Sequence, residues 1–180
     1  MTTLENYIVR FDRADRSSFS YWFAHWCAFN MTALNYKQWK FKYLFHDIEK
    51  PWLKLFLNYK KVQRIHNKHN KHHLLYYFIH EDADWEAMIV DWECGRLTKQ
   101  QCPRNAVDEY YRIFDEFERY INNDELFDNK SIIYFEEHKD KFNKEHLRSL
   151  ISCAYVNLKV TFETKFGIKV EKYNEKYLLE

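Results

Sequence analysis

The chain has 180 residues, which is long enough for one domain with a substantial core. Its two glycines and two prolines are too few for the glycine-rich turns of nucleotide-binding parallel sheets or the many tight turns of all-β folds. A net charge of +1 argues against a membrane surface as partner and, less strongly, against nucleic acid. We therefore expect an all-α fold, a single-domain helical bundle spanning residues 1–180.

The first half of the chain contains several predicted helices. Residues 1–16 are polar and are expected to form an irregular arm, after which Ser17 or Ser18 is expected to cap the first helix. Because a proline disfavours the helical conformation at the residue before it, Pro51 is expected to end one helix near Lys50 and open another. Apolar periodicity places the helices at about residues 18–35, 36–47, 52–58, 61–79 and 85–97.

The second half of the chain looks like a helical scaffold. Amphipathic helices are predicted at about residues 106–121, 131–141 and 144–166, with Gly167 ending the last one. A short polar helix or tail is expected from about residue 169. We therefore assign the scaffold to about residues 104–180 and look for function in about residues 17–100.

Histidines gather in that first part. Five of the nine lie between His66 and His80. A neutral imidazole offers a lone pair to a metal without first losing a proton, so histidine is the commonest metal ligand near neutral pH. Further histidines and aspartates lie on other predicted helices or helix ends of the first part. The two sets together predict a buried metal site. The expected ligands are His25, His46, Asp47, His66, His69, His72, His73 and Asp91.

These ligands fit one or two ions. One ion would take His25, His46, Asp47 and Asp91, and a second would take histidines of the predicted helix 61–79, with Asp47 bridging both. Mixed nitrogen and oxygen ligands suit Mn, Fe, Co, Ni or Zn better than Mg. The competing interpretation is that histidines here pack or face solvent, and we favour it for His80 and for one or two members of the group from His66 to His73.

The order His…His-Asp…Asp on a helical chain resembles the HD-domain superfamily of metal-dependent phosphohydrolases. The segment His46-Asp47-Ile48-Glu49-Lys50 looks like that superfamily's His-Asp-x-x-Lys turn, in which the lysine contacts a substrate phosphate. Glu49 stands where many members have glycine. The run Asn70-Lys71-His72-His73, with Tyr76-Tyr77 and Asp91-Trp92, is similar to a bacterial and phage HD-like family of unassigned function. The resemblance covers about residues 20–97.

The resemblance implies a metal-dependent phosphohydrolase that acts on a nucleotide or other small phosphoester through a metal-activated water. The catalytic residues would be Asp47 and Lys50. Phosphate-binding cations would be Lys50, Lys68, Lys71 and Arg96.

Two further functions remain open at this stage. Some HD-fold proteins with a similar ligand order are di-iron oxygenases, and a helical scaffold of this kind can also serve as a non-enzymatic interaction module. Exposed tyrosines of the second half could serve a homo-oligomer contact, although core packing is the more frequent explanation for such residues. The candidates are Tyr110, Tyr111, Tyr155, Tyr173 and Tyr177.

The four cysteines form no CxxC pair and have no zinc-knuckle spacing. With no signal peptide and no apolar run of about 18 residues, the chain is expected to be cytoplasmic with free thiols.

Overall fold

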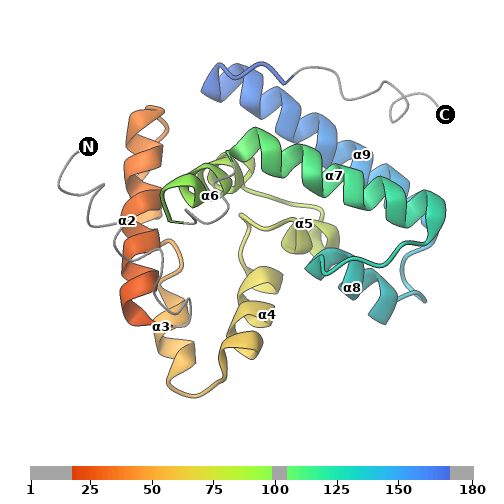
Figure 1. Cartoon of the computed structure of the whole chain (residues 1–180), viewed down its shortest axis with the longest axis horizontal. Helices are drawn as coiled ribbons and strands as arrows, with labels where there is room; N and C mark the ends of the chain where they lie inside the picture. Colours follow the sequence, from red (N-terminus) through yellow and green to blue (C-terminus); the bar gives the residue numbers. More distant parts are fainter. Residues whose placement is uncertain (1–17, 99–104, 171–180) are drawn as a thin grey trace.

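The computed structural model describes residues 18–98 and 105–170 (Figure 1). These residues form one compact domain of helices, with no strand among them, which confirms the predicted all-α fold. Our expectations for residues 1–16 and for Cys102, Tyr173 and Tyr177 lie outside the described residues. In the part that is described, every helix is too short or too polar to cross a membrane.

The described elements follow one another through short connections. In chain order they are α2 (Phe19–Asn35), the 3-10 helix η1 (Phe41–Phe45), α3 (Glu49–Lys54), α4 (Tyr59–His69), α5 (Leu74–His80), α6 (Trp85–Thr98), α7 (Ala106–Asn123), α8 (Lys130–Glu137), α9 (Lys144–Thr161) and the π-helix η2 (Phe162–Phe166).

Polar caps fix where several helices begin. The hydroxyl of Ser18 accepts a hydrogen bond from the Tyr21 amide at 3.1 Å, so the predicted start of the first helix is confirmed. Asn105 and Asp108 form a reciprocal capping box at the start of α7. Gly167, with φ of 64°, ends the last helical segment as predicted.

The prediction of a helix over residues 36–47 was wrong, because only η1 forms there. Backbone carbonyls of η1 bond to side chains of α2: Trp26 Nε1 donates to Leu44 O at 3.0 Å, and Asn30 Nδ2 donates to Tyr43 O at 3.3 Å. The next helix also begins earlier than predicted and holds Pro51 in its first turn. A proline is tolerated there because a first-turn amide has no intrahelical partner.

The prediction of one helix over residues 61–79 was also wrong. The chain is extended at Asn70 and at His73, so α4 and α5 are separate helices. The Asn70 side chain stabilises the break by donating to His66 O at 3.2 Å and to Glu49 Oε1 at 2.9 Å. The break places His72 and His73 on a connecting turn rather than on a helix.

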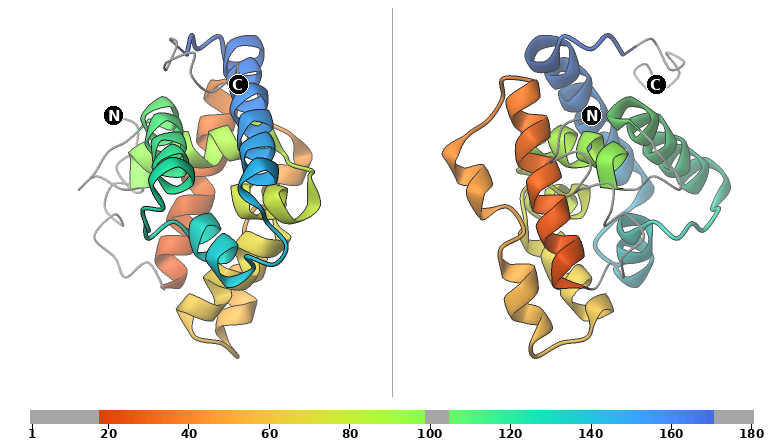
Figure 2. Two further views of the ribbon diagram at one scale, coloured as in Figure 1. Left: turned by 90° about the vertical axis from the view of Figure 1, so that its right-hand side faces the viewer. Right: turned by 60° about the vertical axis from the view of Figure 1, so that its left-hand side comes forward.

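Two apolar clusters make up the core. The larger one lies among α5 to α9 and includes Phe78, whose ring meets the ring of Phe117 edge-on at a centroid distance of 5.4 Å. The smaller one lies between α2 and α6 and includes Phe29. Helix α6 belongs to both, because Met88 packs in the larger cluster and Val90 in the smaller one. Figures 1 and 2 show α6 between α2 on one side and α7 on the other.

Tyrosines that we considered for an oligomer contact pack in the larger cluster or against it. Tyr110 and Tyr155 are buried, and Tyr110 donates a hydrogen bond to Tyr155 O at 3.1 Å. Tyr111 packs against the same cluster while half-buried. Core packing therefore accounts for the three tyrosines among those candidates that the structure describes.

Candidate metal centre

Five parts of the fold converge on one buried cluster of imidazoles and carboxylates. They are α2, the turn between η1 and α3, α4, the turn between α4 and α5, and α6. The cluster contains every predicted ligand except His69, namely His25, His46, Asp47, His66, His72, His73 and Asp91.

One group of possible ligand atoms lies on the α2 and α6 side. The Nε2 atom of His25 is 3.0 Å from Asp91 Oδ1 and 3.5 Å from Asp47 Oδ2. The Nε2 atom of His46 is 3.3 Å from that of His25 and 3.7 Å from Asp91 Oδ1. His25 therefore lies close to both carboxylates and to His46, and His25, His46 and Asp47 form one of the groups that could hold a metal ion. Nitrogen and oxygen donors in such a group are the composition expected of a transition-metal site.

A second group lies on the α4 side. The Nε2 atoms of His66 and His73 are 2.6 Å apart. Asp47 Oδ1 is 3.1 Å from His66 Nε2 and 3.3 Å from His72 Nε2. The two oxygens of the Asp47 carboxylate thus face the two groups, one oxygen toward His25 and the other toward His66 and His72.

Two buried atoms at the centre of the cluster fit a bound cation. Asp47 Oδ1 and His72 Nε2 have no hydrogen-bond partner among the described residues. A buried polar atom without a partner is costly, and each such atom in a folded protein calls for a ligand, an ion or a water. A carboxylate oxygen and an imidazole nitrogen are both metal donors, so the donor chemistry agrees with a divalent ion at this point.

The backbone around Asp47 is held in an uncommon conformation. Its φ is 59°, in the left-handed region that residues other than glycine rarely adopt. The Asp47 carbonyl accepts hydrogen bonds from Trp22 Nε1 at 2.8 Å and from the Lys50 amide at 3.0 Å. Strained backbone of this kind persists where surrounding contacts enforce it, and it often marks a functional position.

A further layer of side chains orients the possible ligands. Glu49 hydrogen-bonds His66 Nδ1, which leaves His66 Nε2 directed at the cluster. The ring of Phe29 stacks on that of His46 at a centroid distance of 3.6 Å. Cys94 Sγ lies 3.6 Å from His25 Nδ1. Partners of this kind fix the ring orientation of metal-binding histidines.

Sequence reasoning did not assign a role to Glu49 or Cys94. Glu49 was noticed only as a departure from glycine in the His-Asp turn, and its position two residues after Asp47 was the available signal. Cys94 lies three residues after Asp91 on α6, a spacing that places both on one helix face. Neither the contact of Glu49 with His66 nor that of Cys94 with His25 could be predicted from the sequence alone.

Burial keeps two of the imidazoles neutral. It lowers the pKa of His46 to about 4, although Asp47 and Asp91 act in the opposite direction. The pKa of His73 lies well below its usual value, first because of burial and then because of the neighbouring imidazoles of His72 and His66. Neutral rings retain the lone pair that a metal requires.

The carboxylates remain charged. Burial acts to raise the pKa of Asp47, but nearby His46 and Lys50 outweigh it, and the pKa lies well below its usual value. For Lys50, burial acts to lower the pKa, but the ion pair with Asp47 prevails and the pKa is raised.

The pKa of His66, in contrast, is raised: burial acts to lower it, but Asp47 and the hydrogen bond to Glu49 outweigh the effect of burial. The cluster therefore combines the neutral imidazoles of His46 and His73 with anionic oxygens and one lysine cation.

The structure does not bring His69 to the cluster. It is the last residue of α4, and its side chain is exposed. The prediction that His69 and His73 are both ligands rested on one unbroken helix over residues 61–79. His73 reaches the cluster from the turn instead.

Three of the predicted phosphate-binding cations also lie elsewhere. Lys71 pairs with Asp82, and Arg96 pairs with Glu93 at 2.9 Å. Lys68 lies over the ring of Tyr134, 4.7 Å from its centroid. Lys50 is the predicted cation that the structure places at the cluster.

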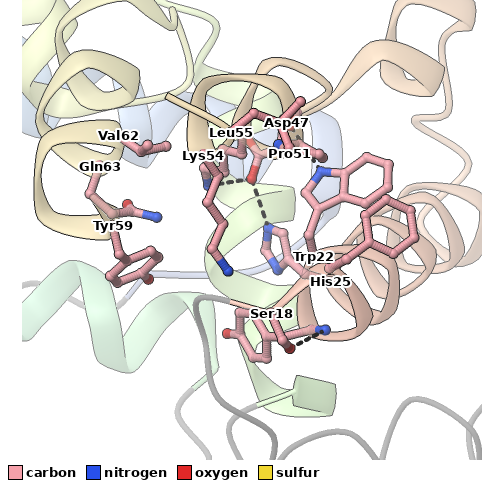
Figure 3. Close-up of a pocket in the computed structure, with 13 residues that line it drawn as sticks. Ser18, Trp22, His25, Asp47, Pro51, Lys54, Leu55, Tyr59, Val62 and Gln63 are labelled. Carbon is pink, nitrogen blue, oxygen red and sulfur yellow. Dashed lines mark hydrogen bonds and ion pairs between the residues drawn. The ribbon is translucent and has the colours of Figure 1, made fainter. Parts of the chain in front are cut away.

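Two pockets open on the cluster and share Tyr21, His25, Lys50, Tyr59 and Gln63. One, of about 340 Å³, runs between α2, α3 and α4 and has mostly apolar walls (Figure 3). The other, of about 370 Å³, is more polar and runs past His73 and Asp91 toward Arg112. A small molecule therefore has two ways to approach the possible ligands.

Comparison of the chain with models of known protein families, with curated proteins and with solved structures gave no match. The fold and the site alone define the class: an all-helical protein with buried His, Asp and Cys groups that have the composition and spacing to hold a metal ion.

Proposed function

We propose that this chain is a metal-dependent phosphohydrolase that binds one or two divalent transition-metal ions at the buried cluster. The observation that carries the proposal is the Asp47 carboxylate, which lies between two sets of imidazoles and has an unpartnered oxygen facing the unpartnered nitrogen of His72. A bound divalent cation supplies Lewis acidity and lowers the pKa of a water molecule toward 7.

The side chains of this site have separate tasks. The imidazoles and carboxylates hold the ions. Lys50 lines both pockets next to Asp47, and its cation is suited to bind an anionic phosphoryl group. Lys54 lines the apolar pocket and adds a second positive charge near its polar end (Figure 3). This charge distribution favours a phosphoester over a neutral substrate.

The test begins with elemental analysis of the purified protein, followed by turnover of aryl phosphate monoesters and diesters with Mn²⁺ or Co²⁺ added. Asp47→Asn keeps the size of the side chain and tolerates the left-handed backbone, so we expect it to fold while losing most bound metal and turnover. His69→Ala is the matched control, because it removes an exposed histidine of the same region and should keep both.

Lys50→Gln separates metal binding from phosphate binding. We expect this variant to retain the metal, because it removes no ligand, and to lose phosphoester turnover. Equal metal content in the parent protein and Asp47→Asn would refute the metal site. Iron content with oxygen uptake and no phosphate release would identify the oxygenase alternative instead.

A further inference from the structure

The apolar pocket beside the metal centre has one polar end and apolar walls. His25, Asp47 and Lys50 form its polar end, and the apolar walls come from three helices. Figure 3 shows Tyr59 and Trp22 on opposite sides, with His25 and Lys54 between them. The apolar wall residues are Phe19, Trp22, Pro51, Leu55 and Val62.

Two of these walls are large apolar side chains that remain in contact with water. Phe19 is 63% exposed and Leu55 is 70% exposed, although both line the pocket. Covering such surface with an apolar group releases free energy roughly in proportion to the area removed from water. The walls therefore favour a ligand with an apolar part.

The polar end requires the opposite property. Lys50 and Lys54 contribute positive charge at or near the polar end, and bound divalent ions would add more. Lys50 is already paired with Asp47, but a neutral apolar molecule would bring no anion to Lys54 or to the bound ions. A small inorganic anion would leave the apolar walls exposed to water. A ligand that satisfies both ends is amphiphilic.

We propose that the apolar pocket takes the alkyl or aryl group of an amphiphilic phosphate monoester and holds its phosphate against the metal centre. This inference rests on the proposed function for the phosphate end and on the pocket walls for the apolar end. It assigns substrate selection to Phe19, Trp22 and Leu55.

Alkylphosphonates test the inference, because their carbon–phosphorus bond is not a phosphoester and their binding can be measured without turnover. Methyl-, propyl- and hexylphosphonate are titrated calorimetrically into the protein loaded with the metal that elemental analysis finds. We expect the dissociation constant to fall about fourfold for each buried methylene, up to about 60-fold between propyl- and hexylphosphonate. Similar constants for all three ligands would overturn the inference.

A pair of leucine variants locates the effect. Leu55→Ala shortens a pocket wall, so we expect hexylphosphonate to bind more weakly while methylphosphonate is unaffected. Leu126→Ala is the matched control, because Leu126 is 71% exposed and lines neither pocket that opens on the cluster. Equal weakening by both variants, or by neither, would overturn the assignment of the wall.

The two proposals fail in different ways. If methylphosphonate binds to the loaded protein and chain length has no effect, the proposed metal-dependent function is supported and the proposal of an amphiphilic ligand is refuted. If no metal binds, the proposed function fails, and the same series is measured on the metal-free protein with 1-hexanol as an uncharged probe. Chain-length dependence there supports the apolar pocket, and its absence overturns it.

Discussion

The Nε2 atom of His72 lies 3.3 Å from Asp47 Oδ1, and both atoms are buried without a hydrogen-bond partner in the described part of the chain. Leaving a buried polar group unsatisfied costs about 1–3 kcal/mol. The two atoms therefore destabilise the metal-free fold. An ion bound between them would remove this unfavourable contribution to the free energy of folding. Metal binding and folding stability are linked at this point.

The first prediction concerns thermal stability with added metal. We expect Mn²⁺, Co²⁺ or Zn²⁺ at about 100 times its dissociation constant to stabilise the fold by about 2.7 kcal/mol, because the ion binds only the assembled cluster. Thermal unfolding followed by circular dichroism measures the shift.

The variant His72→Leu provides the contrast for that measurement. It removes an unpartnered polar atom, so the metal-free protein should not lose stability, while the shift with metal should shrink. The variant His69→Ala should show the full shift. An identical shift in His72→Leu would place the ion elsewhere.

The second prediction concerns Glu49 as a positioning residue. Its carboxylate accepts the hydrogen bond from His66 Nδ1, and Asn70 donates to the same carboxylate at 2.9 Å. Loss of such a partner typically weakens metal affinity about 10–100-fold. We expect this weakening in Glu49→Gln by metal titration, with unchanged helical circular dichroism.

The control for Glu49 is an exposed glutamate outside the cluster. Glu145 lies in the first turn of α9, and Glu145→Gln should leave the metal affinity unchanged. A metal affinity in Glu49→Gln equal to that of the parent would mean that packing alone orients His66.

The third prediction concerns Phe29, which is fully buried and stacks on the ring of His46. We expect Phe29→Ala to destabilise the fold by about 3–5 kcal/mol, because it leaves a cavity in the smaller cluster. Phe56→Ala should change stability by about 0.5 kcal/mol or less, since Phe56 is 84% exposed. Urea unfolding measures both, and equal losses would contradict the placement of Phe29.

The fourth prediction concerns Glu81, which ends α5 with φ of 54°. This left-handed conformation is unfavourable for a residue with a Cβ atom, so we expect Glu81→Gly to stabilise the fold by about 0.5–1 kcal/mol. Glu81→Ala keeps the Cβ atom and should bring no such gain. A gain in both variants would assign the effect to the glutamate charge rather than to the backbone.

Helix starts and ends were predictable where the signal was local. Ser18 and Gly167 act through their own side-chain and backbone properties, so their roles followed from residue type and position. The helix break at Asn70 was not predictable, because its side chain is held by Glu49, which is 21 residues away. The same is true of η1, whose carbonyls bond to side chains of α2.

The site was predictable as a set of residue types but not as a geometry. Histidines and aspartates on separate elements indicated one cluster, and the described structure brings His25 and Asp91 within 3.0 Å of each other. Helical periodicity could not separate His69 from His73, because it assumed an unbroken helix. The phosphate-binding lysines were chosen by nearness in sequence, which does not report where a surface side chain points.

Because α6 packs into both apolar clusters, dividing the chain after this helix would expose core side chains. Met88 and Val90 pack into different clusters, and the same helix supplies Asp91 to the cluster of imidazoles. A fragment that stops after Thr98 would leave Met88 and Ile89 facing water in place of their partners on α7 and α9. We therefore expect the N-terminal half to fold poorly on its own. The position of the Asp91 carboxylate depends on the packing of α6 against both clusters, and the fragment would lack one of them.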